Sequence, residues 1–439
     1  MTLIARTCKS LLTMKPQSQL GLDEIRLGEI PFWSLPRDVR EDAFVTLRRD
    51  RPISFHEELE VPFLGKGPGF WALTKHEDIL EVSRTPEVFS SARGGVTIID
   101  QPPEFSEFFG SMIVMDDPRH ARLRRIVSRA FTPGMLRRVE ADVERAADEI
   151  IDRVAEMERC DFVTEIAAAL PLKIICDMMG IPASEYRFVF DRTNIILGAG
   201  DPEYVADMAD ILPATLQAGQ ELVSMVEDLV RVRKERPTQD LTSALVHAEV
   251  DGERLTSQEI GSFFVLLVAA GNETTRNAIS HGMKALCDYP EQRALWMRDF
   301  SSTAPSAVEE IVRWASPLIH FRRTATRDTE VSGQQIRAGE KVVMFYSSAN
   351  RDEAVFADPY RFDVRRDPND HVGYGGPGPH FCLGAHLARR EIGVMFRELF
   401  RRLPNLEITG DPAYLLSFFI NGIKHLPCEI GEPARAHAR

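Results

Sequence analysis

The sequence predicts a mainly α-helical fold with a small β region, arranged as a single domain. Apolar residues recur at helical spacing from about Pro118 to Leu318, and glycines and prolines mark the ends of successive helices. Strand-like segments are short and lie outside that stretch, at Gly69–Thr74 and within Arg323–Asn350. We see no internal repeat. We therefore expect one domain over residues 21–431, between a flexible N-terminal tail at 1–20 and a C-terminal tail at 432–439.

The composition is typical of a soluble globular protein and argues against two kinds of partner. The chain of 439 residues is 44% apolar and 27% charged, and its net charge of −13 argues against nucleic acid. The apolar run Phe263–Gly271 is far too short to span a membrane. The opening residues have no long apolar stretch and no cleavage site, so we expect a cytoplasmic protein without a signal peptide.

The cysteines suggest a reducing compartment. Six are present, without CxxC or zinc-site spacing, so unpaired thiols are expected. Cys176 and Cys287 lie on apolar helix faces and are expected to be core residues.

Cys382 differs from the others because a glycine-rich loop, Gly373–Gly378, comes before it and a long amphipathic run, Leu383–Leu403, follows. A cysteine near a helix N-terminus is expected to have a lowered thiol pKa. Such a thiolate is either a nucleophile or a metal ligand, and these residues alone leave both open.

The same loop formally matches the dinucleotide-binding pattern GxGxxG. That pattern requires a preceding strand and a helix directly after the glycines, whereas here the upstream residues are polar and the helix starts only after Cys382. A nicotinamide dehydrogenase is therefore rejected. No P-loop, HExxH or GxSxG motif supports another catalytic class.

A central helix of about thirty residues is expected between a capping box, Thr256 with Glu259, and Pro290. Its apolar middle is interrupted by the polar block Gly271–Thr275. In one interpretation the helix emerges into solvent at Asn272. In the other it is kinked beside a hydrated groove, where an acid and a hydroxyl face a bound group and deliver protons.

Several charged residues have helical spacing that gives them a shared face. Glu310 and Arg313 are three apart, which by itself indicates an ordinary structural pair. His120 and Arg124 are four apart and could reach an anion, as could Arg323 and His380; a solvated basic face is the alternative.

Two basic groups are candidates for docking an acidic partner if they meet near Cys382. One comprises Arg119, Arg122, Arg124, Arg125, Arg129, Arg137 and Arg138, and the other Arg389, Arg390, Arg397, Arg401 and Arg402. The proline-containing segment around Gln101–Phe109 is a candidate substrate lid.

Together these motifs resemble the cytochrome P450 family of haem-thiolate monooxygenases over nearly the whole chain. Ala270–Thr275 (AGNETT) resembles the oxygen-activation motif, and Glu310-x-x-Arg313 resembles the ExxR pair. Phe356–Asp363 resembles the segment that packs against that pair, and Gly378–Gly384 resembles the haem-ligand loop. The family usually has phenylalanine seven residues before the cysteine, where this chain has Gly375 beside Tyr374.

The resemblance implies a P450 fold, with the long central helix over a buried haem b, and a role for each matching residue. Cys382 would be the axial thiolate of the iron, and His120, Arg124, Arg323 and His380 would bind the propionates. Thr274 would hydrogen-bond the bound dioxygen, while Glu273 would relay protons through water. Electrons would come from an acidic ferredoxin with its reductase, since the sequence has no flavin or iron–sulfur motif.

The implied reaction inserts one oxygen atom of O2 into a C–H bond of an apolar substrate. The segments Leu170–Pro182 and Asn194–Tyr204 are similar to actinobacterial enzymes that hydroxylate methyl-branched lipids, terpenoids or sterol side chains. Terminal (ω) hydroxylation of a methyl-branched lipid, fatty acid or isoprenoid is the leading expectation. Candidate pocket residues are Ile98, Ile99, Leu267, Ala270 and Ile319, with ordinary core as the alternative.

Other functions remain open at this point. The enzyme could hydroxylate a sterol side chain or a monoterpene, or it could be a peroxide-driven peroxygenase. A non-enzymatic haem sensor is a further alternative, although the sequence shows no signalling or DNA-binding module.

Overall fold

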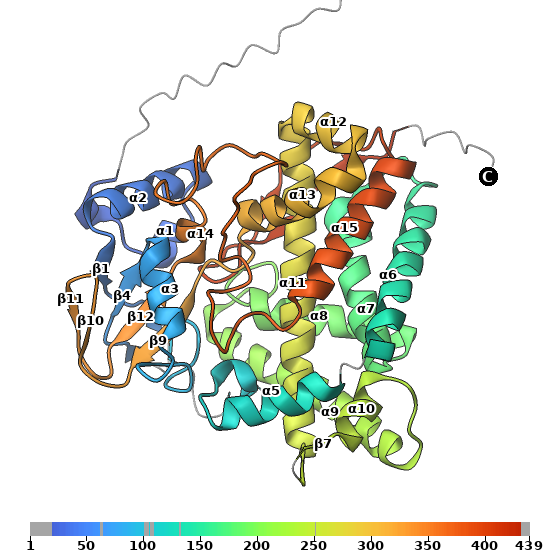
Figure 1. The fold of residues 1–439 in the computed structure, drawn as a ribbon, viewed down its shortest axis with the longest axis horizontal. Helices are drawn as coiled ribbons and strands as arrows, with labels where there is room; N and C mark the ends of the chain where they lie inside the picture. The colour runs from blue at the N-terminus through green and yellow to red at the C-terminus, as the bar shows by residue number, and fades with distance from the viewer. Residues whose placement is uncertain are drawn as a thin grey trace, which may run out of the picture.

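The computed structural model describes residues 20–61, 65–100, 105, 109–130, 133–250 and 252–431. The expected tails, apart from Leu20, and most of the lid candidate Gln101–Phe109 therefore lie outside the described residues. The fold is mainly helical with a small β region, as the sequence predicts (Figure 1).

The β region lies to one side of the molecule, at the left of Figure 1. Its five-stranded sheet has the order β1-β4-β12-β9-β5. The strands are β1 (Ile53–His56), β4 (Phe70–Leu73), β5 (Phe89–Ser90), β9 (Phe321–Ala325) and β12 (Lys341–Met344). Only the β4–β12 pair is parallel. The helices on this side are α1 (Ile30–Trp33), α2 (Arg37–Asp50), α3 (His76–Arg84) and α14 (Tyr346–Ala349).

The helical body surrounds one long helix, α11 (Ser257–Asp288), which runs through the centre of Figure 1. Its N-terminus has the predicted capping box: Thr256 Oγ1 accepts from Glu259 N at 3.1 Å, and Thr256 N donates to Glu259 at 2.9 Å. The helices in contact with it include α7 (Ala169–Met179), α8 (Tyr186–Gly198), α9 (Ile211–Glu235), α13 (Phe300–Ala315) and α15 (Ala385–Arg402). Because neighbours surround its middle, the apolar residues there are buried on every side.

The remaining helices complete the body and its lower edge. They are α5 (Arg119–Ala130), α6 (Pro133–Val154), α10 (Leu241–His247) and α12 (Pro290–Arg298). In the described residues no helix is long and apolar enough to cross a bilayer.

Most of the short strands were not predicted from the sequence. Small sheets pair β2 (Glu60–Val61) with β3 (Gly65–Lys66), β7 (Glu249–Val250) with β8 (Glu253–Arg254), β10 (Thr329–Val331) with β11 (Gln334–Ile336), and β14 (Ala413–Tyr414) with β15 (Ile423–His425). A further sheet has the order β13-β16-β6, with β13 (Glu407–Ile408), β16 (Pro427–Glu429) and β6 (Arg159–Asp161). Strands of two or three residues are too short to show alternation, so their sequences carry no signal.

Candidate active site

Cys382 lines a cavity of about 650 Å³ between α11, α15, α5 and β9. The four anion-binding candidates line the same cavity, although they come from three separate parts of the chain: His120, Arg124, Arg323 and His380. Their distances from one another cannot be predicted from sequence spacing. The fold places a thiol and four basic groups around one space.

The glycine loop reaches this cavity by lying against α3. Gly375 has φ of 88°, a conformation that side chains disfavour, and a Cβ on Gly376 would clash with the hydroxyl of Ser83. The Cys382 amide then donates to the carbonyl of Tyr374 at 3.0 Å. The glycines therefore serve a tight turn and a close packing contact.

Tyr374 lies beside Gly375, the position where the resemblance leads us to expect phenylalanine. Its ring lines the cavity together with Cys382, and the guanidinium of Arg389 lies 4.2 Å from the ring centroid. The aromatic residue one position earlier in the sequence thus lies in the same cavity wall as the thiol.

The expectation of a lowered pKa for Cys382 is wrong for the polypeptide alone. Burial raises the pKa of this thiol, and this outweighs the lowering by the Gly384 amide and by the charges of Arg124 and Arg389. Cys382 precedes α15, which begins at Ala385.

The four basic groups converge on this cavity. The rings of His120 and His380 lie 4.3 Å apart, and burial lowers the pKa of both, that of His380 to about 3. His120 Nδ1 lies 3.4 Å from the carboxylate of Asp117, whereas its Nε2 is buried and has no hydrogen-bond partner. Arg124 and Arg323 donate to backbone carbonyls, of Phe381 and Arg322, each at 2.8 Å. The unpartnered Nε2 of His120 indicates a polar ligand at this end of the cavity.

The central helix passes the cavity without a break, and it does not emerge into solvent. Asn272 is 1% exposed, so the solvent interpretation is wrong. Thr274 lines the cavity, and its hydroxyl donates to the carbonyl of Ala270 at 2.6 Å. Gly271 packs closely against the end of the Ile175 side chain on α7, which would have to shift to admit a Cβ.

Glu273 departs from the expectation that an acid and a hydroxyl face the same bound group. Its carboxylate is buried, is ion-paired with Arg276 and does not line the cavity. Arg276 also donates to Asn194 on α8 at 2.9 Å. Thr274 lines the cavity together with Thr275, whereas Glu273 lies on the side of α11 where Arg276 meets Asn194 of α8.

The surroundings of Glu273 contain several buried polar atoms without protein partners. They are both amide atoms of Asn272, Glu273 Oε1, Arg276 Nε and Asn277 Nδ2. Burial raises the pKa of Glu273, against the opposing charge of Arg276. Buried polar atoms are nearly always hydrogen-bonded, so ordered water is expected among them. Such water would extend a proton path away from Thr274.

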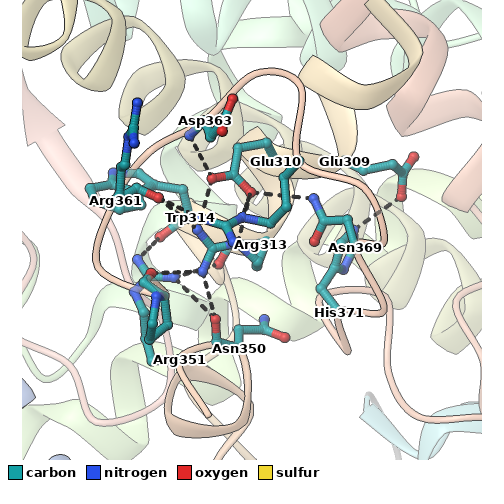
Figure 2. A network of polar contacts seen from close by, with 12 residues as sticks. Glu309, Glu310, Arg313, Trp314, Asn350, Arg351, Arg361, Asp363, Asn369 and His371 are labelled. Carbon is teal, nitrogen blue, oxygen red and sulfur yellow. Dashed lines mark hydrogen bonds and ion pairs between the residues drawn. The ribbon is translucent and has the colours of Figure 1, made fainter. Parts of the chain in front are cut away.

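The Glu310–Arg313 pair has a complete set of partners (Figure 2). Arg313 donates to both carboxylate oxygens of Glu310, at 2.7 and 2.8 Å, and to the carbonyls of Asn350 and Pro359. Glu310 also accepts from Asp363 N at 2.9 Å and from Arg366 Nε at 3.0 Å. The prediction that Phe356–Asp363 packs against this pair is therefore confirmed.

Glu309 links this network to the cysteine loop. It accepts from His371, which comes just before the glycines, at 3.0 Å, and from Arg389 Nη2 on α15, also at 3.0 Å. Burial would raise the pKa of Glu309, but these two partners lower it to about 2. The sequence analysis missed this residue, although it directly precedes Glu310.

A second, apolar cavity of about 380 Å³ adjoins the first. Six residues line both: Ile113, Leu266, Ala270, Thr274, Leu318 and Phe321. Of the candidate pocket residues, Ile99 lines the apolar cavity, Leu267 the thiol cavity and Ala270 both.

Ile98 and Ile319 are wrong as pocket residues. Each is 3% exposed and belongs to the apolar core around Trp33, Phe44 and Phe345. Their neighbours Ile99 and Leu318 line the cavity instead. In both places the neighbouring residue lines the cavity, so the choice was wrong by one position.

The sequence analysis also missed Glu391. This glutamate on α15 is 2% exposed, lines the thiol cavity and has one oxygen without a partner. Burial raises its pKa to about 8, although the hydroxyl of Thr275 lowers it in part. A glutamate within an amphipathic helix is expected to be a surface residue, so its burial could not be predicted from the sequence.

The second basic group is not a free docking surface. On α15, Arg390 and Arg397 are ion-paired with Glu144 of α6, and Arg402 is ion-paired with Asp152. Arg389 pairs with Glu309. The helices α6 and α15 pack together, so these charges are largely neutralised inside the protein.

A thiol, four convergent basic donors and a long helix carrying a hydroxyl define a haem-thiolate site. The four donors could bind the two propionates of haem b. The unpartnered Nε2 of His120 could donate to the edge of the haem, and the apolar walls could contact its faces.

Comparisons with known proteins agree with this class. Residues 304–409 match the cytochrome P450 family model. The chain is 53% identical to the methyl-branched lipid omega-hydroxylase of Mycobacterium tuberculosis, over 94% of this chain and 96% of that protein. It is 40% identical to the steroid C26-monooxygenase of Mycolicibacterium smegmatis, over 88% and 89%. A solved structure of a Mycobacterium marinum cytochrome P450 in complex with pseudoionone is 44% identical, covers 94% of this chain and 100% of that chain, and has a TM-score of 0.87.

This chain therefore belongs to the cytochrome P450 family, and it is a haem-dependent monooxygenase. Its relatives are enzymes, which argues against a non-enzymatic sensor.

Proposed function

We propose that this enzyme hydroxylates the terminal carbon of a methyl-branched lipid or isoprenoid. The observation that carries the proposal is the apolar cavity, which meets the thiol cavity at Ala270 and Thr274. A long aliphatic chain in it would present one end to the reacting centre and bury the rest against apolar side chains. The identity with the methyl-branched lipid omega-hydroxylase supports this substrate class.

Cys382 would ligate the haem iron, and His120, Arg124, Arg323 and His380 would hold the propionates. The bound haem would supply activation of O2, with insertion of one oxygen atom into a C–H bond and release of the other as water. The protein would contribute the thiolate, the orientation of the substrate and the exclusion of bulk water.

Proton delivery would involve two groups that face different sides of α11. Thr274 would hold a proton at its hydroxyl on the cavity side, and Glu273 would replenish it through the buried water expected around Asn272 and Asn277. Arg276 would position the Glu273 carboxylate through their ion pair.

Electrons would come from an acidic ferredoxin and its reductase in the cytoplasm. The supporting surface is on α5, where Arg119 and Arg129 are exposed, close to the half-buried Arg124 beside the cysteine loop. Phe381, next to Cys382, is 39% exposed and would be an apolar contact within this basic rim.

The test is a spectral titration of the purified enzyme with branched fatty acids, isoprenoid alcohols and sterols, followed by product analysis. Binding displaces water from the iron and shifts the Soret band, and the proposal expects ω-hydroxylated product from the branched chains. A flat response to all the lipids would overturn it. Product from peroxide alone, unaffected by Thr274→Ala, would favour the peroxygenase alternative.

Hydroxylation of a sterol side chain is the second candidate, because steroid C26-monooxygenases are 40–42% identical to this chain. The titration distinguishes the two candidates, since sterols and acyclic chains are tested side by side.

A further inference from the structure

The apolar cavity has one ionisable residue in its described lining, Asp100. The other lining residues are hydrophobic, apart from glycine and a few hydroxyl side chains such as Thr97, Thr215 and Ser417. Among the described lining residues, Asp100 is therefore the one that can select ligands by charge.

Two cationic side chains hold the carboxylate of Asp100 in place. Arg322 Nη1 lies 2.7 Å from Oδ1, and Lys341 Nζ lies 2.9 Å from Oδ2. Arg322 also donates to the carbonyl of Arg93, at 3.1 Å, and so fixes the loop that carries Asp100. The position of this carboxylate is thus set by the sheet beneath it.

The side chain of Asp100 is accessible, whereas the side chains of its two cationic partners are buried. The side chain of Asp100 is 52% exposed, but those of Arg322 and Lys341 are 3% and 2% exposed. Lys341 is also paired with Glu58 at 2.8 Å. A ligand in the cavity would therefore meet the negative group, with the positive groups covered.

The carboxylate keeps acceptor capacity for a ligand. Burial alone would raise the pKa of Asp100, but the hydrogen bond from Lys341 and the charge of Arg322 lower it below its ordinary value, so the group is ionised at neutral pH. Two ionised oxygens offer about four acceptor positions, and the cations occupy only some of them.

In ω-hydroxylation the terminal carbon lies at the reacting centre, next to Thr274, so the functionalised end of the substrate lies elsewhere in the cavity. We infer that Asp100 is a specificity-determining residue that selects substrates whose distal end is an uncharged hydrogen-bond donor, such as an alcohol, over ionised carboxylic acids. The inference rests on the proposed function. A hydroxyl donates to Asp100, whereas a carboxylate head would be repelled and could not donate.

The test compares three ligands with the same branched chain: isopalmityl alcohol, isopalmitic acid and its methyl ester. Dissociation constants come from spectral titration at neutral pH and low salt. The wild-type enzyme is expected to bind the alcohol more tightly than the acid. In Asp100→Asn this preference should shift toward the acid by about tenfold, because removal of one charge leaves the covered cations to attract the carboxylate. The ester, which has no charge and no donor, is the internal reference.

Two further variants separate specificity from structure. Asp100→Glu keeps the charge and should retain the preference for the alcohol. Glu60→Gln, on the exposed strand β2 beside the lining residue Val61, makes the same change of charge outside the cavity lining and should leave the preference unchanged. A structural role for Asp100 would weaken all three ligands equally, and that outcome overturns the inference. Binding of none of the three to the wild type would overturn the proposed function and this inference with it.

Discussion

Two glutamate–arginine pairs, each three residues apart on a helix and each buried, have opposite surroundings. Glu310–Arg313 on α13 has side chains that are 0% exposed, and both members have several further partners. Glu273–Arg276 on α11 is 2% and 3% exposed, yet Glu273 Oε1 and Arg276 Nε have no partner. A fully satisfied buried pair favours one rigid arrangement, whereas a partly satisfied pair leaves room for water and for transfer of protons. The same sequence spacing thus gives a fully hydrogen-bonded pair in one helix and a pair with unpartnered atoms in the other, and we propose a role in proton delivery for the second.

The largest expected effect is on the scaffold pair. Glu310→Gln leaves Arg313 and Arg366 as buried cations without a full counter-charge, which typically costs about 3–5 kcal/mol. We expect little folded, haem-containing protein, measured by the Soret absorbance per mole of polypeptide. Glu309→Gln, the same change one residue earlier in a partly exposed pair, is the control and should lower the yield much less. Equal yields from the two variants would show that the deeper burial of Glu310 does not make its substitution more damaging.

The second effect should fall on catalysis and not on folding. Glu273→Gln is expected to keep haem content and thermal stability near those of the wild type, while product formation falls by about tenfold or more. Arg276→Ala should disturb the position of Glu273, and because it leaves a buried carboxylate without its counter-charge it should also lower stability. The measurement is hydroxylated product per electron pair supplied, with a solvent isotope effect. A collapse of haem content in Glu273→Gln would make this pair a scaffold like the first.

A third buried glutamate extends the comparison, because Glu391 has no cationic partner and a pKa of about 8. Its folded pKa lies above the unfolded value, so its carboxyl favours the folded state below about pH 4.5, and this contribution is lost as the pH rises toward 8. Glu391→Gln cannot ionise and should be more stable than the wild type at pH 9, by on the order of 2 kcal/mol, with a smaller difference at pH 5. Thermal unfolding of the holoenzyme at both pH values checks this, and a pH-independent difference would contradict it.

The smallest effect is expected at a surface pair. Glu144, which bridges Arg390 and Arg397, has a side chain that is 31% exposed. Glu144→Gln should cost about 1 kcal/mol or less, and the loss should shrink in high salt. Thermal unfolding at low and high ionic strength measures it. A loss of stability as large as that of Glu310→Gln would contradict the expectation that more deeply buried ion pairs contribute more to stability.

Much of this protein could be predicted from the sequence because its signals are local. The capping box at Thr256, the length of α11 and the loop before Cys382 depend on residues close together in the chain. The mistakes at Ile98 and Ile319 were shifts of one residue in segments outside helices and named strands, where no local signal defines the inner face. Glu391 was missed because its burial depends on α11 lying across α15.

The sequence by itself determined the family, and it supplied the candidates for the axial cysteine and the propionate ligands, since short motifs define residue type and spacing. Only the tertiary structure decided that Glu273 faces away from the cavity, that the arginines of α15 are neutralised by α6, and that Asp100 covers Arg322 and Lys341. These outcomes depend on segments that are distant in the chain and adjacent in space. Burial and charge pairing, which set pKa values and specificity, arise only when the chain is folded.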